Sequence, residues 1–281
     1  MKTIVFLNGK GGTGKSASAT TLAHIIATVH GKRTLLVDMD PQSNASAMYS
    51  EADFEHIFFQ IYTGKEMENR PASVENMLMD SSLDPHECII HTEYENLDMI
   101  PAFLTLSEAE ERMKADTITV QQFKLKKQLD KVKDEYDMCL IDCGPSVSLL
   151  NVNALAAADE VYIPTRSDGN SLIGIAITVN LVRTVQEYNP KLRIGGIFIT
   201  QYSKVKNVSK ATYSILEDVF PDEFLPITVG VTKNLEENSM EQKPLLEMDK
   251  KGKVSKSYLK LAEYILAPNK KKFIEQYRKE I

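Results

Sequence analysis

The sequence predicts a single α/β domain in which helices cover both faces of a mostly parallel, twisted sheet. Short apolar segments alternate with segments of helical periodicity along most of the 281 residues, which is typical of parallel strands joined by helices. A glycine-rich stretch joins the first apolar segment to the first helix, as in a P-loop domain. No repeat or linker interrupts the pattern, so residues 1–281 are expected to form one domain.

The individual elements follow from these two periodicities. Strands are expected where short apolar runs end at polar or turn-forming residues. They cover residues 3–7, 33–38, 96–100, 138–142, 160–164 and 192–201. Helices are expected where apolar residues recur every three or four positions. They cover residues 22–29, 120–133 (as an exposed helix), 148–158, 173–185 and 208–219, and two more, separated at Pro268, close the chain.

Two segments differ in character from the rest. Residues 50–133 are rich in charge and methionine, and we expect an irregular group of short helices there with one strand. Residues 243–281 contain eleven Lys or Arg against five Asp or Glu, which predicts a basic helical segment. Such an asymmetry indicates either an anionic partner at one end of the molecule or a solvated helix face.

The composition is that of an ordinary globular protein and argues against several classes. Hydrophobic residues make up 43% and charged residues 26%, and the net charge is −6. No apolar run approaches the roughly 18 residues of a membrane-spanning helix, and the first residues lack the pattern of a signal peptide. Cys88, Cys139 and Cys143 fit neither a disulfide framework nor a zinc site. A cytoplasmic location and buried thiols are therefore expected.

A phosphate-binding loop is the strongest motif. Glycines allow the backbone to turn with its N–H groups inward, and the following helix adds the positive end of its dipole. Lys15 is expected to contact the β- and γ-phosphates of a nucleotide, and Ser16 to bind Mg²⁺ through its hydroxyl. The expected cofactor-binding residues are Gly9, Lys10, Gly11, Gly12, Thr13, Gly14, Lys15, Ser16 and Ala17.

Three aspartates are expected beside this loop, because ligands of open α/β sheets bind at the carboxyl ends of the strands. Asp142 ends an apolar strand, where a second acidic residue reaches the Mg²⁺ shell of a P-loop enzyme. Asp38 and Asp40 end the strand at residues 33–38 and precede a turn. The alternative for each is that the carboxylate caps a helix or a turn.

Lys10 directly follows the first glycine of the loop, and this feature resembles the deviant Walker A motif of the ParA/MinD/Soj ATPases. Four further segments are similar to that family, in the same order along the chain. They are residues 35–45, residues 97–102, residues 137–145 with Asn153, Ala154 and Leu155 beyond, and residues 243–245. The resemblance is weakest at residues 50–83, and in size the chain is similar to the short partition ATPases of the ParA/Soj type.

The resemblance implies a role for each of these residues. Lys10 would reach across a dimer to the partner's phosphates, and Asp40 would position the attacking water. Lys15 would act on the phosphates of its own chain. The residues implied for the Mg²⁺ shell are Ser16, Asp38 and Asp142.

The resemblance also implies cofactors and partners. ATP and Mg²⁺ would be bound between two chains of a homodimer. Hydrolysis would be slow until a ParB-type centromere-binding adaptor stimulates it. The ATP-bound dimer would bind DNA without sequence preference, which would place the protein on the nucleoid.

Several positions depart from the family pattern. Thr13 and Ser16 stand where valine and threonine are frequent, and Gly144 stands where a second proline is common. Residues 165–170 have an unusual sequence, and residues 227–232 lack the arginines often found there. The DNA contacts of the family are therefore not transferred to this chain by position.

Binding to DNA would need a basic surface, because lysines that pair with phosphates release counterions. Two groups of lysines are candidates, one after the strand at residues 192–201 and one near the C-terminus. They are Lys204, Lys206, Lys210, Lys250, Lys251, Lys253 and Lys256. Each of them alone is equally explained as a solvated side chain, so only their clustering is informative.

The alternative function is a MinD-like membrane-surface ATPase that positions a cellular structure, which would need a terminal amphipathic helix. Phe273, Ile274 and Tyr277 share one face of the last helix. However, Glu275 and Glu280 dilute its basic side, so packing on the domain is favoured. The cysteines do not match the nitrogenase iron proteins, the tail lacks the tyrosines of bacterial tyrosine kinases, and the acids beside the loop disfavour a binding module without hydrolysis.

Overall fold

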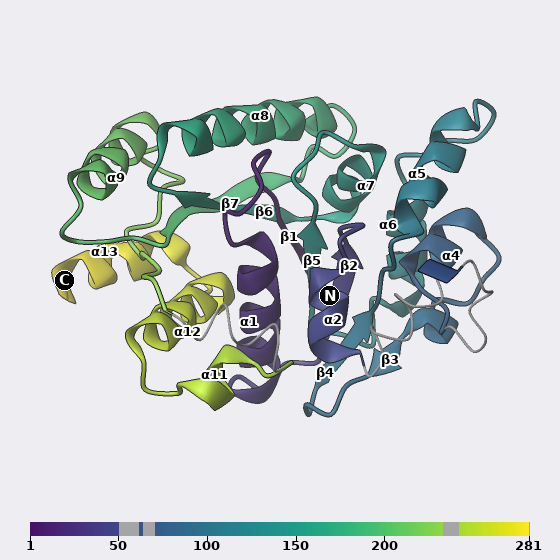
Figure 1. The fold of residues 1–281 in the computed structure, drawn as a ribbon, viewed down its shortest axis with the longest axis horizontal. Helices are drawn as coiled ribbons and strands as arrows, with labels where there is room; N and C mark the ends of the chain where they lie inside the picture. Colours follow the sequence, from purple (N-terminus) through teal and green to yellow (C-terminus); the bar gives the residue numbers. More distant parts are fainter. Residues whose placement is uncertain (51–61, 64–70, 233–241, 281) are drawn as a thin grey trace.

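The sheet at the centre of the molecule is seen in the computed structural model, which describes residues 1–50, 62–63, 71–232 and 242–280. Within these ranges, seven strands form one sheet in the order β3-β4-β2-β5-β1-β6-β7 (Figure 1). The strands are β1 (Lys2–Phe6), β2 (Thr34–Met39), β3 (Ile90–His91), β4 (Leu97–Ile100), β5 (Met138–Cys143), β6 (Glu160–Arg166) and β7 (Arg193–Thr200). Neighbouring strands are parallel except for the pair β3 and β4.

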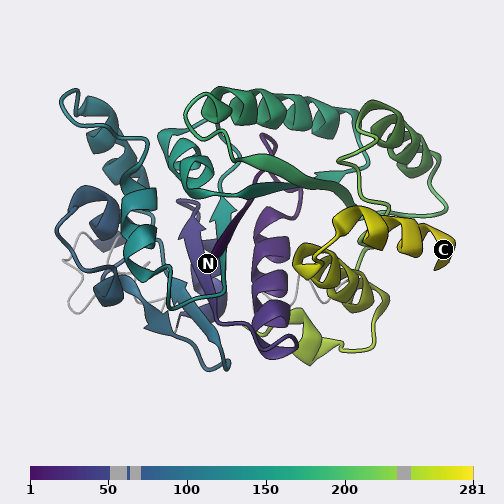
Figure 2. The same cartoon turned by 180° about the vertical axis from the view of Figure 1, so that it is seen from behind.

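Helices cover both faces of this sheet, as predicted (Figures 1 and 2). They are α1 (Lys15–Thr28), α2 (Asn44–Tyr49), α4 (Val74–Met79), α5 (Leu106–Ala115), α6 (Lys124–Val132), α7 (Leu149–Ala157), α8 (Gly169–Gln186), α9 (Asn207–Val219), α11 (Leu245–Met248), α12 (Lys253–Leu266) and α13 (Lys270–Glu280), with a 3₁₀ turn η1 (Pro85–Cys88). In Figure 1, α4, α5 and α6 lie at one end of the molecule, and α9 and α13 lie at the other.

The two faces carry separate cores, because successive residues of a strand point to opposite sides of the sheet. On β1, Val5 belongs to the core beneath α4 to α9. Its neighbours Ile4 and Phe6 belong to the core beneath α1, α2, α11 and α12. A strand that is buried on both faces reads as a continuous apolar run, which is why the parallel strands were recognisable in the sequence.

All six predicted strands are present, with ends shifted by no more than two residues. The short strand β3 was not predicted, so the described part of segment 50–133 holds two strands where one was expected. Ile90 of β3 pairs with Met99 of β4, and His91 pairs with Asp98, in antiparallel register. A strand of two residues is too short to carry a recognisable alternation, so its presence depends on the neighbouring strand.

The helix expected at residues 120–133 begins later, and the expectation that it is exposed was wrong. Asp116 Oδ1 accepts hydrogen bonds from the backbone N–H groups of Ile118 and Thr119, at 2.9 and 3.2 Å. This turn keeps the residues that follow it out of the helix, and α6 begins at Lys124. Leu125 and Leu129, one turn apart, are buried in the core, so one face of α6 packs on the domain.

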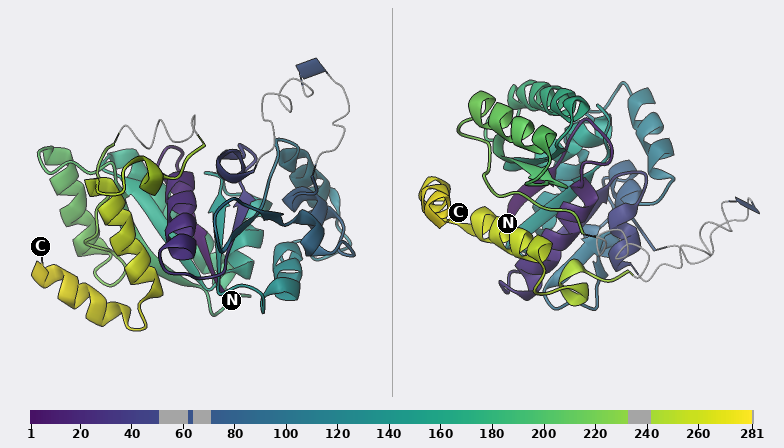
Figure 3. Two further views of the ribbon diagram at one scale, coloured as in Figure 1. Left: turned by 90° about the horizontal axis from the view of Figure 1, so that it is seen from below. Right: turned by 60° about the vertical axis from the view of Figure 1, so that its left-hand side comes forward.

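The last two helices pack on the face of the sheet that carries α1 (Figure 3). Phe273, Ile274 and Tyr277 of α13 lie against the core of that face. Arg278 Nη2 also forms an ion pair with Glu217 Oε1 of α9, at 3.0 Å. The packing of α13 on the domain, expected from the sequence, is therefore confirmed. Across the described ranges, no helix combines the length and the apolar character needed to cross a membrane.

Glu160, the first residue of β6, ties α13 to the beginning of the chain. Its Oε2 atom lies 3.0 Å from Lys2 Nζ and 2.5 Å from Lys270 Nζ. The Lys270 ammonium also lies 5.1 Å from the ring centres of Tyr162 and Tyr264. Burial lowers the pKa of Lys270 to about 8, and the Glu160 carboxylate opposes this. The position of Lys270 therefore depends on its counter-charge.

We predict that Glu160→Gln destabilises the domain, because the Lys270 ammonium would keep its buried position and lose its counter-charge. Breaking a well-buried ion pair costs roughly 3–5 kcal/mol, and partial exposure of both lysines reduces the expected loss of unfolding free energy to about 2 kcal/mol. Urea-induced unfolding at neutral pH measures it. The control Glu263→Gln removes the surface pair with Lys260 and should cost less than about 0.5 kcal/mol. Equal losses in the two variants would contradict the prediction.

Candidate nucleotide-binding site

The glycine-rich loop lies at the carboxyl edge of the sheet, between β1 and α1. Gly12 and Gly14 have φ angles of 71° and 84°, in the left-handed region where other residues are strained. Gly14 is the N-cap of α1, which begins at Lys15. The loop therefore leads directly into a helix N-terminus, the arrangement that favours binding of an anion such as phosphate.

Helix α8 braces the first half of this loop. The backbone N–H of Gly9 donates to Thr178 Oγ1 at 2.9 Å, and that of Lys10 donates to Asn8 Oδ1 at 3.0 Å. Gly174 of α8 approaches so closely that a Cβ there would overlap Asn8 Oδ1 and lie 2.9 Å from Lys10 Cβ. The backbone of the loop is therefore held by a helix that follows it by some 160 residues in the chain.

Strand β7 braces the second half of the loop. Thr200, its last residue, donates its hydroxyl to Thr13 O at 2.9 Å and packs 3.4 Å from the place where a Cβ on Gly14 would stand. Sequence reasoning missed Thr178 and Thr200 because they come from remote segments. Gly174 did carry a signal, since glycine inside a helix is costly unless a close approach requires it.

Lys15 is buried in the first turn of α1, within electrostatic reach of the acids of the site. Its Nζ donates to Lys10 O at 3.1 Å. Burial lowers the pKa of Lys15, and the carboxylates of Asp142 and Asp40 oppose this change. The structure therefore brings the predicted loop lysine together with two of the predicted acids.

Asp142 near the end of β5 stands opposite Asp38 of β2 and Phe6 of β1. Its carboxylate is fully buried, and neither oxygen accepts a hydrogen bond from the residues that the structure describes. Burial raises the pKa of Asp142 well above its usual range, and the Ser16 hydroxyl and the Lys15 ammonium nearby oppose this. A buried carboxylate of this kind is costly unless a cation or ordered water joins it. Asp142 and Ser16 therefore fit the oxygen ligand set that Mg²⁺ prefers.

Asp38 organises the loop that follows β2. Its Oδ1 accepts a hydrogen bond from Asp40 N at 3.0 Å, and its Oδ2 accepts from Ser46 N and Ser46 Oγ at 2.8 and 2.7 Å. Burial raises the pKa of Asp38 to about 6, whereas these hydrogen bonds lower it. The contacts of Asp38 match the turn-capping alternative that the sequence left open, and its place in the Mg²⁺ shell stays a prediction.

Asp40 is held between two loops at the edge of the site. Its Oδ1 accepts a hydrogen bond from Gln42 N at 3.0 Å, and a Cβ on Gly144 would lie 3.2 Å from the same oxygen. The loop after β5 is fixed in turn by Asn151 of α7, which donates to the carbonyls of Gly144 and Ser146. The departure from the family pattern at Gly144 thus leaves room for the Asp40 carboxylate.

Lys10 is bonded to the N-terminus of α8. Its Nζ lies 2.6 Å from Asp168 Oδ1, and Asp168 caps α8 by accepting a hydrogen bond from Ser171 N at 2.9 Å. Asp168 was not among the predicted site residues. It lies in residues 165–170, and the unusual sequence of this segment was the only available signal.

The seven lysines predicted to contact DNA are exposed, and their two groups are neighbours. Gly230 lies between them, since a Cβ on it would stand 3.7 Å from Val254 Cγ2 and 3.9 Å from Tyr202 O. Residues 201–216 contain three lysines and no acid, and residues 249–259 contain four lysines and one acid. Among the residues that the structure describes, none forms an ion pair with these seven. They make one basic surface, here called the lysine surface.

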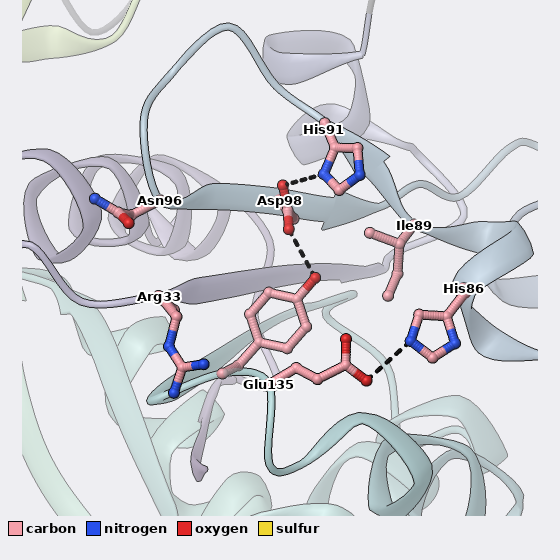
Figure 4. A pocket seen from close by; sticks show the side chains of 8 residues that line it. Arg33, His86, Ile89, His91, Asn96, Asp98 and Glu135 are labelled. Atoms are coloured by element: carbon pink, nitrogen blue, oxygen red, sulfur yellow. Dashed lines mark hydrogen bonds and ion pairs between the residues drawn. The ribbon is translucent and has the colours of Figure 1, made fainter.

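A separate hollow of about 360 Å³ opens at the opposite, amino edge of β2 and β4 (Figure 4). Asp98 accepts a hydrogen bond from Tyr136 OH at 2.7 Å and lies 2.8 Å from His91 Nδ1. His86 Nε2 lies 2.9 Å from Glu135 Oε1. The polar side chains around this hollow thus satisfy one another, and the predicted site residues lie at the other edge of the sheet.

The fold and the site define a nucleotide-binding protein of the P-loop class. The features that define it are a parallel sheet, a glycine loop that leads into a helix, and a buried carboxylate at the end of a neighbouring strand. A family model described as an AAA domain matches residues 1–194. The chain is 34% identical over 269 residues to the sporulation initiation inhibitor protein Soj of Bacillus subtilis, which covers 95% of this chain and 98% of that protein.

A second Soj protein and a solved structure narrow the assignment. Identity to the chromosome-partitioning ATPase Soj of Treponema pallidum is 34% over 267 residues, 95% of this chain and 97% of that protein. The structure resembles a putative plasmid partition protein from Borrelia burgdorferi bound to AMPPNP, with a TM-score of 0.71, 26% identity, and coverage of 100% of this chain and 99% of that one. The chain belongs to the ParA/Soj-type family of partition ATPases.

We predict that Gly174→Ala impairs nucleotide binding and stability together, because its Cβ would displace Asn8, which holds the backbone of Lys10. The expected loss of unfolding free energy is roughly 1–3 kcal/mol, as for other overpacked sites. Thermal unfolding and titration with a fluorescent ATP analogue measure the two effects. The control is Gly169→Ala in the same helix, where a Cβ meets nothing within 4 Å. Normal nucleotide affinity in Gly174→Ala would contradict the bracing role.

Proposed function

We propose that this protein is a DNA-partitioning ATPase that forms a homodimer around MgATP and binds DNA without sequence preference in that state. One observation carries the proposal: Lys15, Asp40 and Asp142 converge at a single glycine loop. They do so in a chain 34% identical, over nearly its whole length, to a chromosome-partitioning ATPase. The DNA that is moved would be a plasmid, a chromosome or a mobile element.

The site supplies position and charge rather than a covalent intermediate, which is what phosphoryl transfer requires. Bound Mg²⁺ would neutralise charge on the β- and γ-phosphates. Ser16 and Asp142 are the residues to hold it, directly or through water. Lys15 binds the phosphates from the first turn of α1. Asp40, fixed between two loops, orients the attacking water.

Lys10 is proposed to complete the site of a second chain. It lies at the rim of the loop, and its side chain is 29% exposed. From that position a lysine can add a positive charge to the phosphates of a facing copy. Because each chain would supply the other's charge, ATP hydrolysis would be coupled to dimer formation. A ParB-type adaptor that stabilises this arrangement would accelerate a reaction that is otherwise slow.

The lysine surface is proposed to bind the DNA backbone. Its seven lysines give a local positive charge on a chain whose net charge is −6, and local potential rather than net charge steers an anion to a surface. Contacts to phosphate alone carry no sequence information, so binding would be nonspecific and would hold the ATP dimer on the nucleoid in the cytoplasm.

We predict that Asp40→Ala binds ATP but hydrolyses it at least about 100-fold more slowly, because the attacking water loses its orienting carboxylate. The variant should therefore persist as a dimer on DNA. Cosedimentation with nonspecific duplex DNA, in ATP and in ADP, measures this, with anionic liposomes in parallel. We expect pelleting with DNA in ATP alone.

Lys15→Ala serves as the control, since it would lose nucleotide binding and should pellet with neither surface. Equal DNA binding in ADP would contradict the nucleotide switch. Binding to liposomes but not to DNA would instead assign the protein to the MinD-like membrane ATPases.

We predict that replacing Lys204, Lys206 and Lys253 together by Ala lowers the slope of log affinity against log salt by about 2.7, at about 0.9 for each phosphate contact. Fluorescence anisotropy with a labelled duplex, between low and moderate salt, measures the slope. The control variant replaces three exposed lysines elsewhere: Lys127, Lys133 and Lys191. The same reduction in both variants would mean that overall charge, and not the lysine surface, binds DNA.

A further inference from the structure

We propose that Asp168 is a positioning residue that restrains Lys10 within its own chain and so sets how readily ATP drives two chains together. This rests on the proposed role of Lys10 in a dimer. The Lys10 ammonium lies 2.6 Å from Asp168 Oδ1 and 3.5 Å from Ser171 Oγ. A lysine bonded in this way is not available to the phosphates of a second chain.

The backbone of Lys10 is fixed, so only its side chain can change partners. Its N–H donates to Asn8 Oδ1 and its carbonyl accepts from Lys15 Nζ. Its Cβ lies against Gly174 of α8, where no larger residue would fit. A change of partner for Lys10 therefore means a rotation of its side chain and requires no rearrangement of the loop.

The Asp168 carboxylate is fixed independently of Lys10. Asp168 is the N-cap of the 18-residue helix α8, and its Oδ1 accepts a hydrogen bond from Ser171 N at 2.9 Å. Its Oδ2 lies 3.8 Å from Arg166 Nε. The carboxylate would stay in place when Lys10 leaves it, because the helix and a second cation both retain it.

The helix itself disfavours a cation at this place. The N-terminus of α8 carries the positive end of the helix dipole, which repels an ammonium group. Arg166 adds a further positive charge nearby. The Asp168 carboxylate is therefore what makes the position of the Lys10 ammonium favourable, and removal of its charge should release the lysine.

The restraint is weak enough to be overcome by ATP. The side chains of Lys10 and Asp168 are 29% and 35% exposed, and ion pairs of such exposure contribute little. We expect release of one lysine to change the equilibrium about threefold. A dimer releases two, so its dissociation constant should change by about tenfold.

The variant Asp168→Asn tests this, because Asn caps a helix as well as Asp does and removes only the charge. In the Asp40→Ala background, which slows hydrolysis, the dimer dissociation constant in saturating ATP is measured by sedimentation velocity. We expect Asp168→Asn to dimerise about tenfold more tightly. Increasing salt should close the gap, because screening weakens the pair in the parent protein. An unchanged or weaker dimer would overturn the proposal.

Two further variants separate this proposal from its premise. If Lys10→Ala dimerises as the parent does, the role of Lys10 in a dimer fails, and the present proposal fails with it. If Lys10→Ala dimerises poorly and Asp168→Asn has no effect, only the present proposal fails. In the double variant Lys10→Ala/Asp168→Asn, the Asp168 substitution should add nothing. A tenfold effect there would show that Asp168 does not act through Lys10, and Asp168→Glu should restore parental behaviour.

Discussion

The parallel register of β1, β2 and β5 is the constraint on which the site depends. β5 pairs with both neighbours so that Asp142 stands opposite Phe6 and Asp38. A slip of one residue would turn Asp142 to the other face of the sheet, because successive side chains point to opposite sides. The same register brings the glycine loop, the Asp40 loop and the loop after β5 to one edge. The catalytic groups come from three segments and are positioned by a single alignment.

The parts of this arrangement that could be predicted have a local cause in the sequence. The parallel strands are buried on both faces and therefore appear as apolar runs that end at polar residues. Lys15 and Ser16 belong to a glycine motif whose geometry and chemistry are contained in eight residues, and Asp142 ends such a run. The resemblance to the partition ATPases added Lys10 and Asp40, whose roles no local pattern would have indicated.

The parts that could not be predicted depend on contacts between distant segments. Thr178 and Thr200 brace the loop through single hydroxyl groups, and threonines at such positions are ordinary in helices and strands. Asp38 lay where a metal-binding acid was expected, yet the backbone of the following turn and Ser46 occupy both of its oxygens. Asp168 became visible only when the fold brought α8 against the loop. Local sequence identifies the candidates for chemistry, and the fold decides which of them are free to act.

The bracing of the loop has a consequence for the order of events during synthesis. Residues 9–16 are among the first to leave a ribosome, but Gly174, Thr178 and Thr200, which hold them in shape, emerge far later. The central strand β1 likewise finds its neighbours β5 and β6 only after more than half of the chain has been made. A growing chain therefore carries the phosphate motif long before it has a phosphate site, so incomplete chains cannot compete with finished molecules for nucleotide.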